Sequence, residues 1–217
     1  MHHVDEGEPD ASLLTVLTTE HFTLQGARAN TISESTARAA LYVGALSASL
    51  VALGLLAQAT ELGTAFTIFV LVVLPTLYAI GTFTFVRLVE SSVEDLTYGR
   101  AINRIRAYYQ RVARDQARFL ALGGHDDVAG VLANMGMSRP SRWQLYFTLG
   151  AMVAVLNGVV GGSAIAFAAD RLGAPVGAAA GVGAAAAVLS LAVSLRWQRG
   201  FHDRASAEAE VLFPSPS

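Results

Sequence analysis

The sequence predicts an all-α protein that crosses a membrane four times, and two properties of its composition indicate this class. Charged residues make up only 15% of the 217 residues, whereas soluble domains carry about 25%. Mean hydropathy is +0.46. Four stretches carry no charged residue at all: 39–60, 62–86, 143–169 and 172–195. Each exceeds the roughly 20 residues that a helix needs to cross a hydrocarbon core of about 30 Å.

Helix is the expected conformation of these stretches because lipid cannot satisfy exposed backbone groups. The spans divide the chain into five segments. These are an N-terminal segment with a helix (1–37), a first transmembrane hairpin (38–86), a long helical segment (87–141), a second hairpin (142–196) and a tail (197–217).

The distribution of arginine predicts the orientation of the spans. There is no lysine, and 14 of the 15 arginines lie outside the two short turns at Glu61 and Asp170–Arg171. Arginine is retained on the cytoplasmic side of membranes. We therefore expect both termini and segment 87–141 in the cytoplasm, facing the membrane's inner surface.

The first 38 residues contain six acids, two arginines and no apolar run typical of a signal peptide. The first span is therefore expected to direct insertion. A helix is predicted over residues 18–36, with Leu24, Ala27 and Ile32 as a weak apolar stripe.

A second helix is predicted from Arg87 to about Leu122, where Gly99 is the only glycine. One face carries arginines, and the other has an apolar seam at spacings of three and four, typical of a coiled coil. The seam consists of Ile102, Ile105, Tyr109, Val112 and Phe119. Three partners fit this helix. The seam can pack on the N-terminal helix of the same chain or hold together a homo-oligomer, and the arginines can face anionic lipid headgroups or a nucleotide.

No Asp, Glu, Lys, Arg or His lies in any of the four spans, which argues against proton relays, coupled transport and voltage sensing. Asn157 is expected to bond neighbouring helices, with pore lining as the alternative, and Gln58 is the other polar candidate. Glu61 is either a solvated turn residue or part of a ring at a pore mouth. Pro75 should kink the second span, either as a tolerated bend or as a gating hinge.

Small residues repeat every four positions in two spans. The rows are Gly173, Gly177 and Gly181, and Ala40, Gly44, Ala48 and Ala52. Such rows let helix backbones approach closely. They predict tight packing, either within the chain or against another copy.

Motifs for catalysis are missing. Without lysine there is no phosphate-binding loop, and neither H-E-x-x-H nor G-x-S-x-G occurs. There is no cysteine. His125, Asp126 and Asp127 form the one acidic cluster beside a histidine, which favours a turn that caps a short helix over a metal site. We expect no enzymatic activity, cofactor, bound metal or nucleic-acid partner.

Residues 20–60 carry a resemblance. The stretch from Glu20–His21 through Arg38–Ala39 to Ala57–Thr60 resembles a family of small, uncharacterised bacterial multi-pass membrane proteins. The resemblance implies a bacterial plasma membrane and supplies no activity. The order of helix, two spans and long helix is also similar to the two-span effector modules of nucleotide-signalled antiphage systems, although this chain adds a second hairpin.

Together these features predict a non-enzymatic, homo-oligomeric pore, channel or membrane-breaching effector. The alternative is a scaffold or accessory subunit that anchors a partner through its cytoplasmic helix and conducts nothing.

Overall fold

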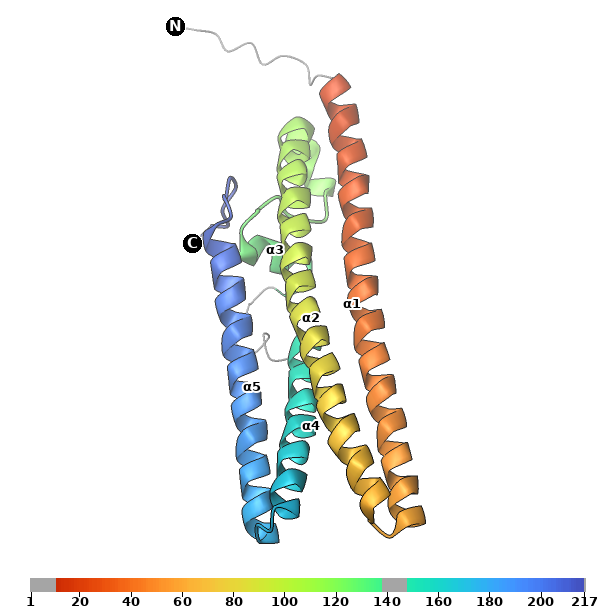
Figure 1. The fold of residues 1–217 in the computed structure, drawn as a ribbon. Helices are drawn as coiled ribbons and strands as arrows, with labels where there is room; N and C mark the ends of the chain where they lie inside the picture. The colour runs from red at the N-terminus through yellow and green to blue at the C-terminus, as the bar shows by residue number, and fades with distance from the viewer. Residues whose placement is uncertain (1–10, 138–147, 217) are drawn as a thin grey trace, which may run out of the picture. The chain divides into compact units, whose positions relative to one another are not determined.

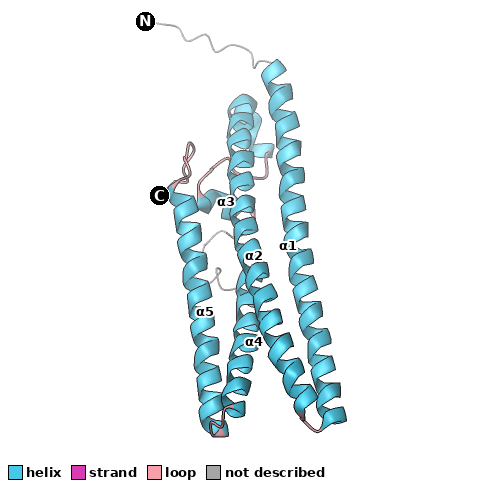
Figure 2. Ribbon diagram, viewed as in Figure 1, coloured by secondary structure: helices cyan, strands magenta, loops and turns pink. Residues whose placement is uncertain are grey.

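A computed structural model of the protein describes residues 11–137 and 148–216. In this part every regular element is helical (Figures 1 and 2). The elements are α1 (Ala11–Thr60), α2 (Thr64–Ala113), the 3₁₀ helix η1 (Arg114–Phe119), α3 (Val128–Asn134), α4 (Leu149–Arg171) and α5 (Val176–Ala207). α1, α2, α4 and α5 are each long and apolar enough to cross a membrane. The predicted all-α class with four such helices is confirmed.

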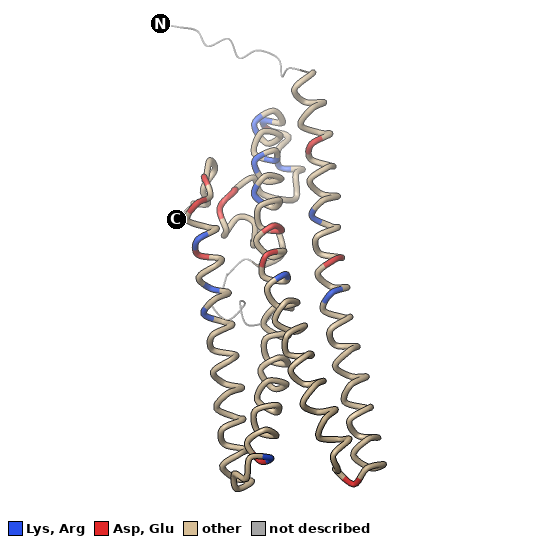
Figure 3. Tube along the Cα trace, viewed as in Figure 1, with Lys and Arg blue, Asp and Glu red and all other residues tan. Residues whose placement is uncertain are grey.

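The helices contribute to two compact units, which are described separately. The polar unit comprises the described residues of Met1–Ser33, Ser92–Pro140 and Ser206–Ser217. The apolar unit comprises those of Glu34–Ser91 and Ser141–Ala205. Figure 3 shows long uncharged stretches of α4 and α5 in the apolar unit. The predicted segment boundary at 141–142 lies outside the described residues.

Two predicted helix boundaries are wrong. Residues 18–36 are helical as predicted, but the helix neither begins at 18 nor ends at 36, because α1 runs unbroken from Ala11 to Thr60, a stretch without proline. The second helix ends at Ala113 rather than near Leu122. Arg114 has a φ of +46°, and this left-handed backbone interrupts the α-helical hydrogen bonds, so that a tighter 3₁₀ turn follows.

The core of the apolar unit joins α1, α2 and α4. Its two clusters of buried side chains are centred on Tyr42, Val89 and Val153 and on Leu46, Leu74 and Val160. The apolar faces of three spans thus pack on one another inside a single chain.

α5 packs on α4 through small residues. A Cβ at Gly183 would lie 2.6 Å from the carbonyl oxygen of Gly162 and from the Cβ of Ala166. A Cβ at Gly158 would lie 3.0 Å from the carbonyl oxygen of Ala187. The two backbones therefore meet closely along this row.

The predicted glycine row lies elsewhere. A Cβ at Gly177 or Gly181 would have nothing within 4 Å, and Gly173 lies in the α4–α5 turn with a φ of +91°. On α1, Gly44 is equally open. Of the two alternatives for these rows, the structure does not support packing within the chain at Gly44, Gly177 or Gly181, and packing against another copy stays a prediction. The buried row of α5 is offset by two residues from the predicted one, and both rows consist of small residues.

The offset between the packed row and the predicted row of α5 leads to a testable prediction. Gly183→Ala should lower the free energy of unfolding by about 1–3 kcal/mol, since the added methyl overfills a closed contact. Gly177→Ala places the same methyl in open space and should leave stability near that of the parent. Titration of the detergent-solubilised protein with dodecyl sulfate, followed by circular dichroism, measures both. Equal midpoints for the two variants would contradict the assignment of the packed row.

Candidate functional site

Asn157 lies at the junction of three helices in the apolar unit. Its Nδ2 donates to Thr82 Oγ1 at 3.0 Å, and Tyr42 OH donates to its Oδ1 at 3.3 Å. A Cβ at Gly81 would overlap the Asn157 amide. The side chain is thus buried and bonded to α1 and α2, as expected for a residue that holds helices together.

The other candidate residues of the two hairpins do not lie near Asn157. Gln58 and Glu61 are exposed at the far end of α1, and Pro75 is exposed within an unbroken α2. Along α1, Gln58 is about 24 Å from Tyr42, at 1.5 Å per residue. Glu61 has a φ of 44° in the turn between α1 and α2. These predicted positions therefore do not form one polar path in the chain.

The groove between α4 and α5 is apolar. It has a volume of about 240 Å³ and is lined by Val159, Gly162, Ser163, Ala166, Ala180, Gly183, Ala184 and Ala187. Ser163 is the only lining residue with a polar side chain. A lining of this kind does not replace the hydration shell of an ion.

The apolar seam of α2 is largely buried within the polar unit. Ile102 is 2% exposed and Ile105 is 7% exposed. Tyr109 donates from its OH to Thr18 Oγ1 at 3.4 Å, and its ring centroid lies 5.7 Å from that of His21. Both contacts are with α1. The structure thus favours the same-chain partner over the homo-oligomer for this part of the seam.

The end of the seam also differs from the prediction. Val112 is half-buried near the end of α2. Phe119 lies in η1 and is 75% exposed, because the helix that would have carried it along the seam ends six residues earlier. Its nearest charged contact is Arg118, whose guanidinium lies 5.1 Å from its ring centroid. Phe119 is not part of a continuous coiled-coil seam.

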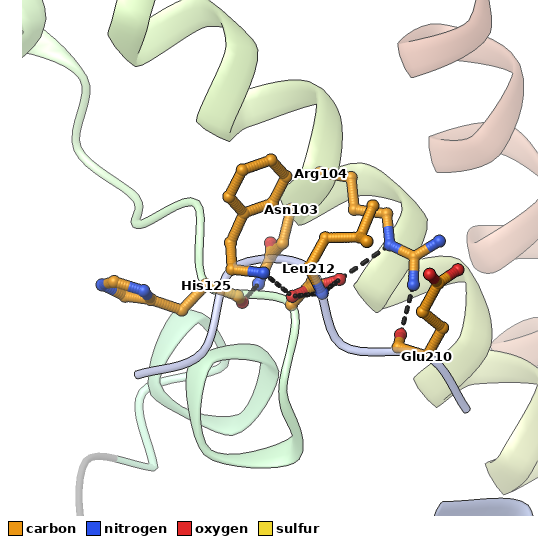
Figure 4. A network of polar contacts seen from close by, with 7 residues as sticks. Asn103, Arg104, His125, Glu210 and Leu212 are labelled. Atoms are coloured by element: carbon orange, nitrogen blue, oxygen red, sulfur yellow. Dashed lines mark hydrogen bonds and ion pairs between the residues drawn. The ribbon is translucent and has the colours of Figure 1, made fainter. Parts of the chain in front are cut away.

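The turn His125–Asp127, here called the acidic turn, holds the C-terminal segment of the chain (Figure 4). Asp126 is 0% exposed. Its carboxylate accepts from the backbone N–H groups of Leu212 and Phe213 at 2.7–3.1 Å. Arg104 Nε donates to the same carboxylate at 2.7 Å. A fully buried charge is tolerated only when it is paired and hydrogen-bonded in this way.

Asp127 holds the next residues of the same segment. Its side chain caps α3 by accepting from the Gly130 N–H at 2.7 Å, so the predicted cap is confirmed. It also accepts from the N–H and the hydroxyl of Ser215, at 2.9 and 2.8 Å. In addition, the N–H of Asp126 donates to the Phe213 carbonyl at 3.0 Å. Residues 210–215, here called the tail segment, are therefore fixed by side chains and backbone together.

Two arginines of α2 complete the contact with the tail segment. Arg104 donates to the carbonyl oxygen of Glu210, and Figure 4 shows its side chain between the acidic turn and Glu210. The Arg111 guanidinium lies 5.3 Å from the centroid of the Phe213 ring. The arginine-bearing face of the predicted helix thus includes two residues, Arg104 and Arg111, that contact the chain's own C-terminal segment.

The acidic turn itself is anchored to α2 by amides. Asn103 Nδ2 donates to the His125 carbonyl at 2.6 Å, and Asn134 Nδ2 donates to Asn103 Oδ1 at 2.8 Å. A Cβ at Gly124 would lie 2.7 Å from the backbone of Ala107. Only glycine allows the turn to approach α2 this closely.

The metal alternative for this turn finds no support in the geometry. The oxygens of both carboxylates already accept hydrogen bonds from the chain. Among residues 11–137 and 148–216, no group of three or more His, Cys, Asp or Glu side chains is placed to hold a metal ion. The turn is a structural fastening for the tail segment.

Positive charge accumulates on the α1–α2 face of the polar unit. Arg28 pairs with Asp95 through two hydrogen bonds of 2.7 and 3.1 Å. Burial, and then the charge of Arg28, lower the pKa of Arg106. Burial, and then the charge of Arg106, likewise lower the pKa of His21. The neutral form of His21 is thereby favoured at physiological pH.

The acidic turn should make the tail segment sensitive to acid. Burial alone would raise the pKa of Asp126 and of Asp127, but hydrogen bonds from the tail segment and from Arg104 or Gly130 outweigh it, and both pKa values fall below the ordinary 3.8. A carboxylate with a lowered pKa stabilises the fold fully above its ordinary value and loses that contribution as pH falls below it. The contribution should therefore persist at neutral pH and vanish in strong acid.

Thermal unfolding of the detergent-solubilised protein between about pH 6 and about pH 3 tests this linkage. We expect the midpoint to fall more for the parent than for a variant with Asp126→Asn and Asp127→Asn. If the unfolding midpoints of the two proteins fell equally with pH, other carboxyl groups would dominate acid unfolding.

The tail segment is the feature that the sequence did not reveal. The only signal is the apolar pair Leu212–Phe213, which follows a charged stretch close to the C-terminus.

Comparison with protein-family models gives no match for the chain, and neither the curated proteins nor the solved structures contain a match.

Proposed function

We propose that the protein is a non-enzymatic, multi-pass membrane protein that anchors a partner through its polar unit, as a scaffold or accessory subunit. One observation carries the proposal. Chain segments from before the first apolar stretch, between the second and third, and after the fourth fold together into one unit. The acidic turn fixes the tail segment within it. A chain that needed only to cross the membrane would not require this fastening.

Features of the sequence support one orientation and one compartment for the protein. The arginine bias supports a cytoplasmic polar unit, because the polar unit and the adjoining helix ends carry 14 of 15 arginines. The resemblance of residues 20–60 to small bacterial membrane proteins supports the plasma membrane of a bacterium.

The absence of cysteine from the chain allows a clean test of this orientation. Single-cysteine variants at Asp115 and Glu208 should resist a membrane-impermeant maleimide in intact cells and react after lysis. A cysteine at Glu61 should react from outside. Labelling of position 115 in intact cells would overturn the orientation.

A homo-oligomeric pore or membrane-breaching effector is the second candidate. It is favoured by the open faces of α1 and α5, where a Cβ at Gly44, Gly177 or Gly181 would meet no atom of the described residues within 4 Å. These rows suit close packing between copies. The bonds of Asn157 to Tyr42 and Thr82 within one chain support a pore between copies over a pore through a single chain.

Ion flux and cross-linking separate the two functions. We expect purified protein in liposomes to conduct no ions above the level of empty liposomes. A photo-reactive residue in place of the exposed Phe119 or Phe22 should yield, in cells, an adduct that is not a multiple of the chain's own mass. Ion flux together with adducts that are only multiples of the chain's mass would replace the scaffold with the pore.

A further inference from the structure

Arg100 is a buried charge for which the described part of the chain supplies no hydrogen-bond or ionic partner. The residue lies on α2 in the polar unit and is 7% exposed. Its Nε is fully enclosed and has no hydrogen-bond acceptor. Arginine cannot lose its proton in a protein, so this side chain cannot avoid the cost of burial by becoming neutral.

Two carboxylates of the polar unit, those of Asp95 and Asp126, are engaged by other arginines. Asp95 receives both hydrogen bonds of Arg28. The Asp126 carboxylate accepts a hydrogen bond from Arg104, which lies one helical turn beyond Arg100 on α2. It also accepts hydrogen bonds from two backbone N–H groups. Neither of these two ion pairs includes Arg100.

The polar unit that carries Arg100 contains further arginines on α1 and α2. The guanidinium carbon of Arg28 lies 3.7 Å from the position of a Cβ at Gly99, the residue that precedes Arg100. Arg106 lies on the same helix, and its pKa is lowered by burial and by Arg28. A cationic environment of this kind attracts an anion, and a multiply charged anion most strongly.

From this arrangement we propose that Arg100 anchors a binding site for a phosphate-bearing anion. The planar guanidinium presents a fork of donors that matches two oxygens of one phosphate group. With 7% of its surface exposed, Arg100 is accessible to a small anion and not to a folded partner. The phosphate belongs either to a membrane lipid headgroup or to a soluble compound. The site is independent of the proposed scaffold function, which concerns a protein partner.

The test compares two probes on full-length protein in neutral detergent. Inorganic phosphate is titrated against chloride at equal ionic strength, and the thermal unfolding midpoint is followed. Separately, native mass spectrometry counts bound phosphatidylglycerol against bound phosphatidylcholine. We expect the wild-type protein to be stabilised by phosphate or to retain phosphatidylglycerol selectively. A response to phosphate alone indicates a soluble ligand, and selective lipid retention indicates a headgroup.

Arg100→Met is the diagnostic variant, and Arg118→Met is its matched control. Arg118 lies in η1, just after α2, and is exposed, whereas Arg100 is buried. Each variant removes one positive charge, so the comparison isolates the effect of position. Arg100→Met should weaken the response to the effective probe by about ten-fold or more, as expected for a lost hydrogen bond to a charged group. Its midpoint without the probe should equal or exceed that of the parent, because an unpaired buried charge has been removed. Arg118→Met should respond as the parent does.

Arg100→Lys provides a second measurement that does not depend on the apolar variant folding. It keeps the charge but loses the fork, and should weaken binding while retaining selectivity over chloride or phosphatidylcholine. The proposal is overturned if wild-type protein shows no preference with either probe, or if Arg100→Met and Arg118→Met respond alike.

Discussion

Replacing Asp126 with alanine is expected to lower the free energy of unfolding by about 3–5 kcal/mol and to release the tail segment. The loss is large because the carboxylate is 0% exposed and joins three donors. Its removal leaves the Arg104 guanidinium and the N–H groups of Leu212 and Phe213 without their acceptor. The carboxylate is buried and the Arg104 side chain is 35% exposed, so much of the expected cost arises from the two tail N–H groups that lose their acceptor.

Two measurements check this result. Denaturant unfolding in detergent reports stability, and timed digestion with carboxypeptidase reports release of the tail segment. Asp115→Ala is the matched control, because it removes the same carboxylate from an exposed position on η1. If Asp126→Ala and Asp115→Ala were digested at the same rate, the acidic turn would not be what holds the tail.

A double variant sharpens the assignment. Adding Arg104→Met to Asp126→Ala removes the guanidinium that the first change leaves unpaired. The two residues are in contact, so their effects should not add. We expect the double variant to be less destabilised than the sum of the single variants predicts. Strict additivity would show that Asp126 acts through the tail's N–H groups alone.

The four long apolar helices could be predicted because their signal is one of composition. A stretch such as 143–169 has no charge, and the bilayer permits only a helix there. The same property concealed which face of each helix is packed. Rows of small residues occur on more than one face of α5, so the sequence singled out Gly177 while the chain packs on Gly183.

The polar unit was less predictable because its contacts are distant in sequence. The cap at Asp127 is local, and its position before a short apolar run identified it. The contact between Asp126 and Leu212 joins residues 86 positions apart, and periodicity carries no information about such pairs. The spacing of the apolar seam likewise does not distinguish another copy from α1 of the same chain, which contacts the seam at Tyr109.

The second large effect is expected at Gly81, where α2 meets the junction of α1 and α4. Gly81→Ala should lower the free energy of unfolding by about 3 kcal/mol. A methyl at this position would overlap the Asn157 amide and lie 2.7 Å from the Tyr42 hydroxyl. Overfilling a packed site costs about 1–3 kcal/mol. Displacing Asn157 also separates its amide from Thr82 and Tyr42, and an unsatisfied buried polar group adds about 1–3 kcal/mol.

Gly44→Ala supplies the matched control for this change. Gly44 lies on α1 in the same apolar unit, and nothing is within 4 Å of the added methyl. Both variants gain the same helix propensity, so the difference between them isolates the contact with Asn157. Dodecyl sulfate titration should place the midpoint of Gly81→Ala well below that of Gly44→Ala. A second variant, Asn157→Ala combined with Gly81→Ala, should recover part of the loss, because the overlapping amide is then gone. If the combined variant were less stable than Gly81→Ala alone, the cost at Gly81 would arise from the helix backbone and not from the amide of Asn157.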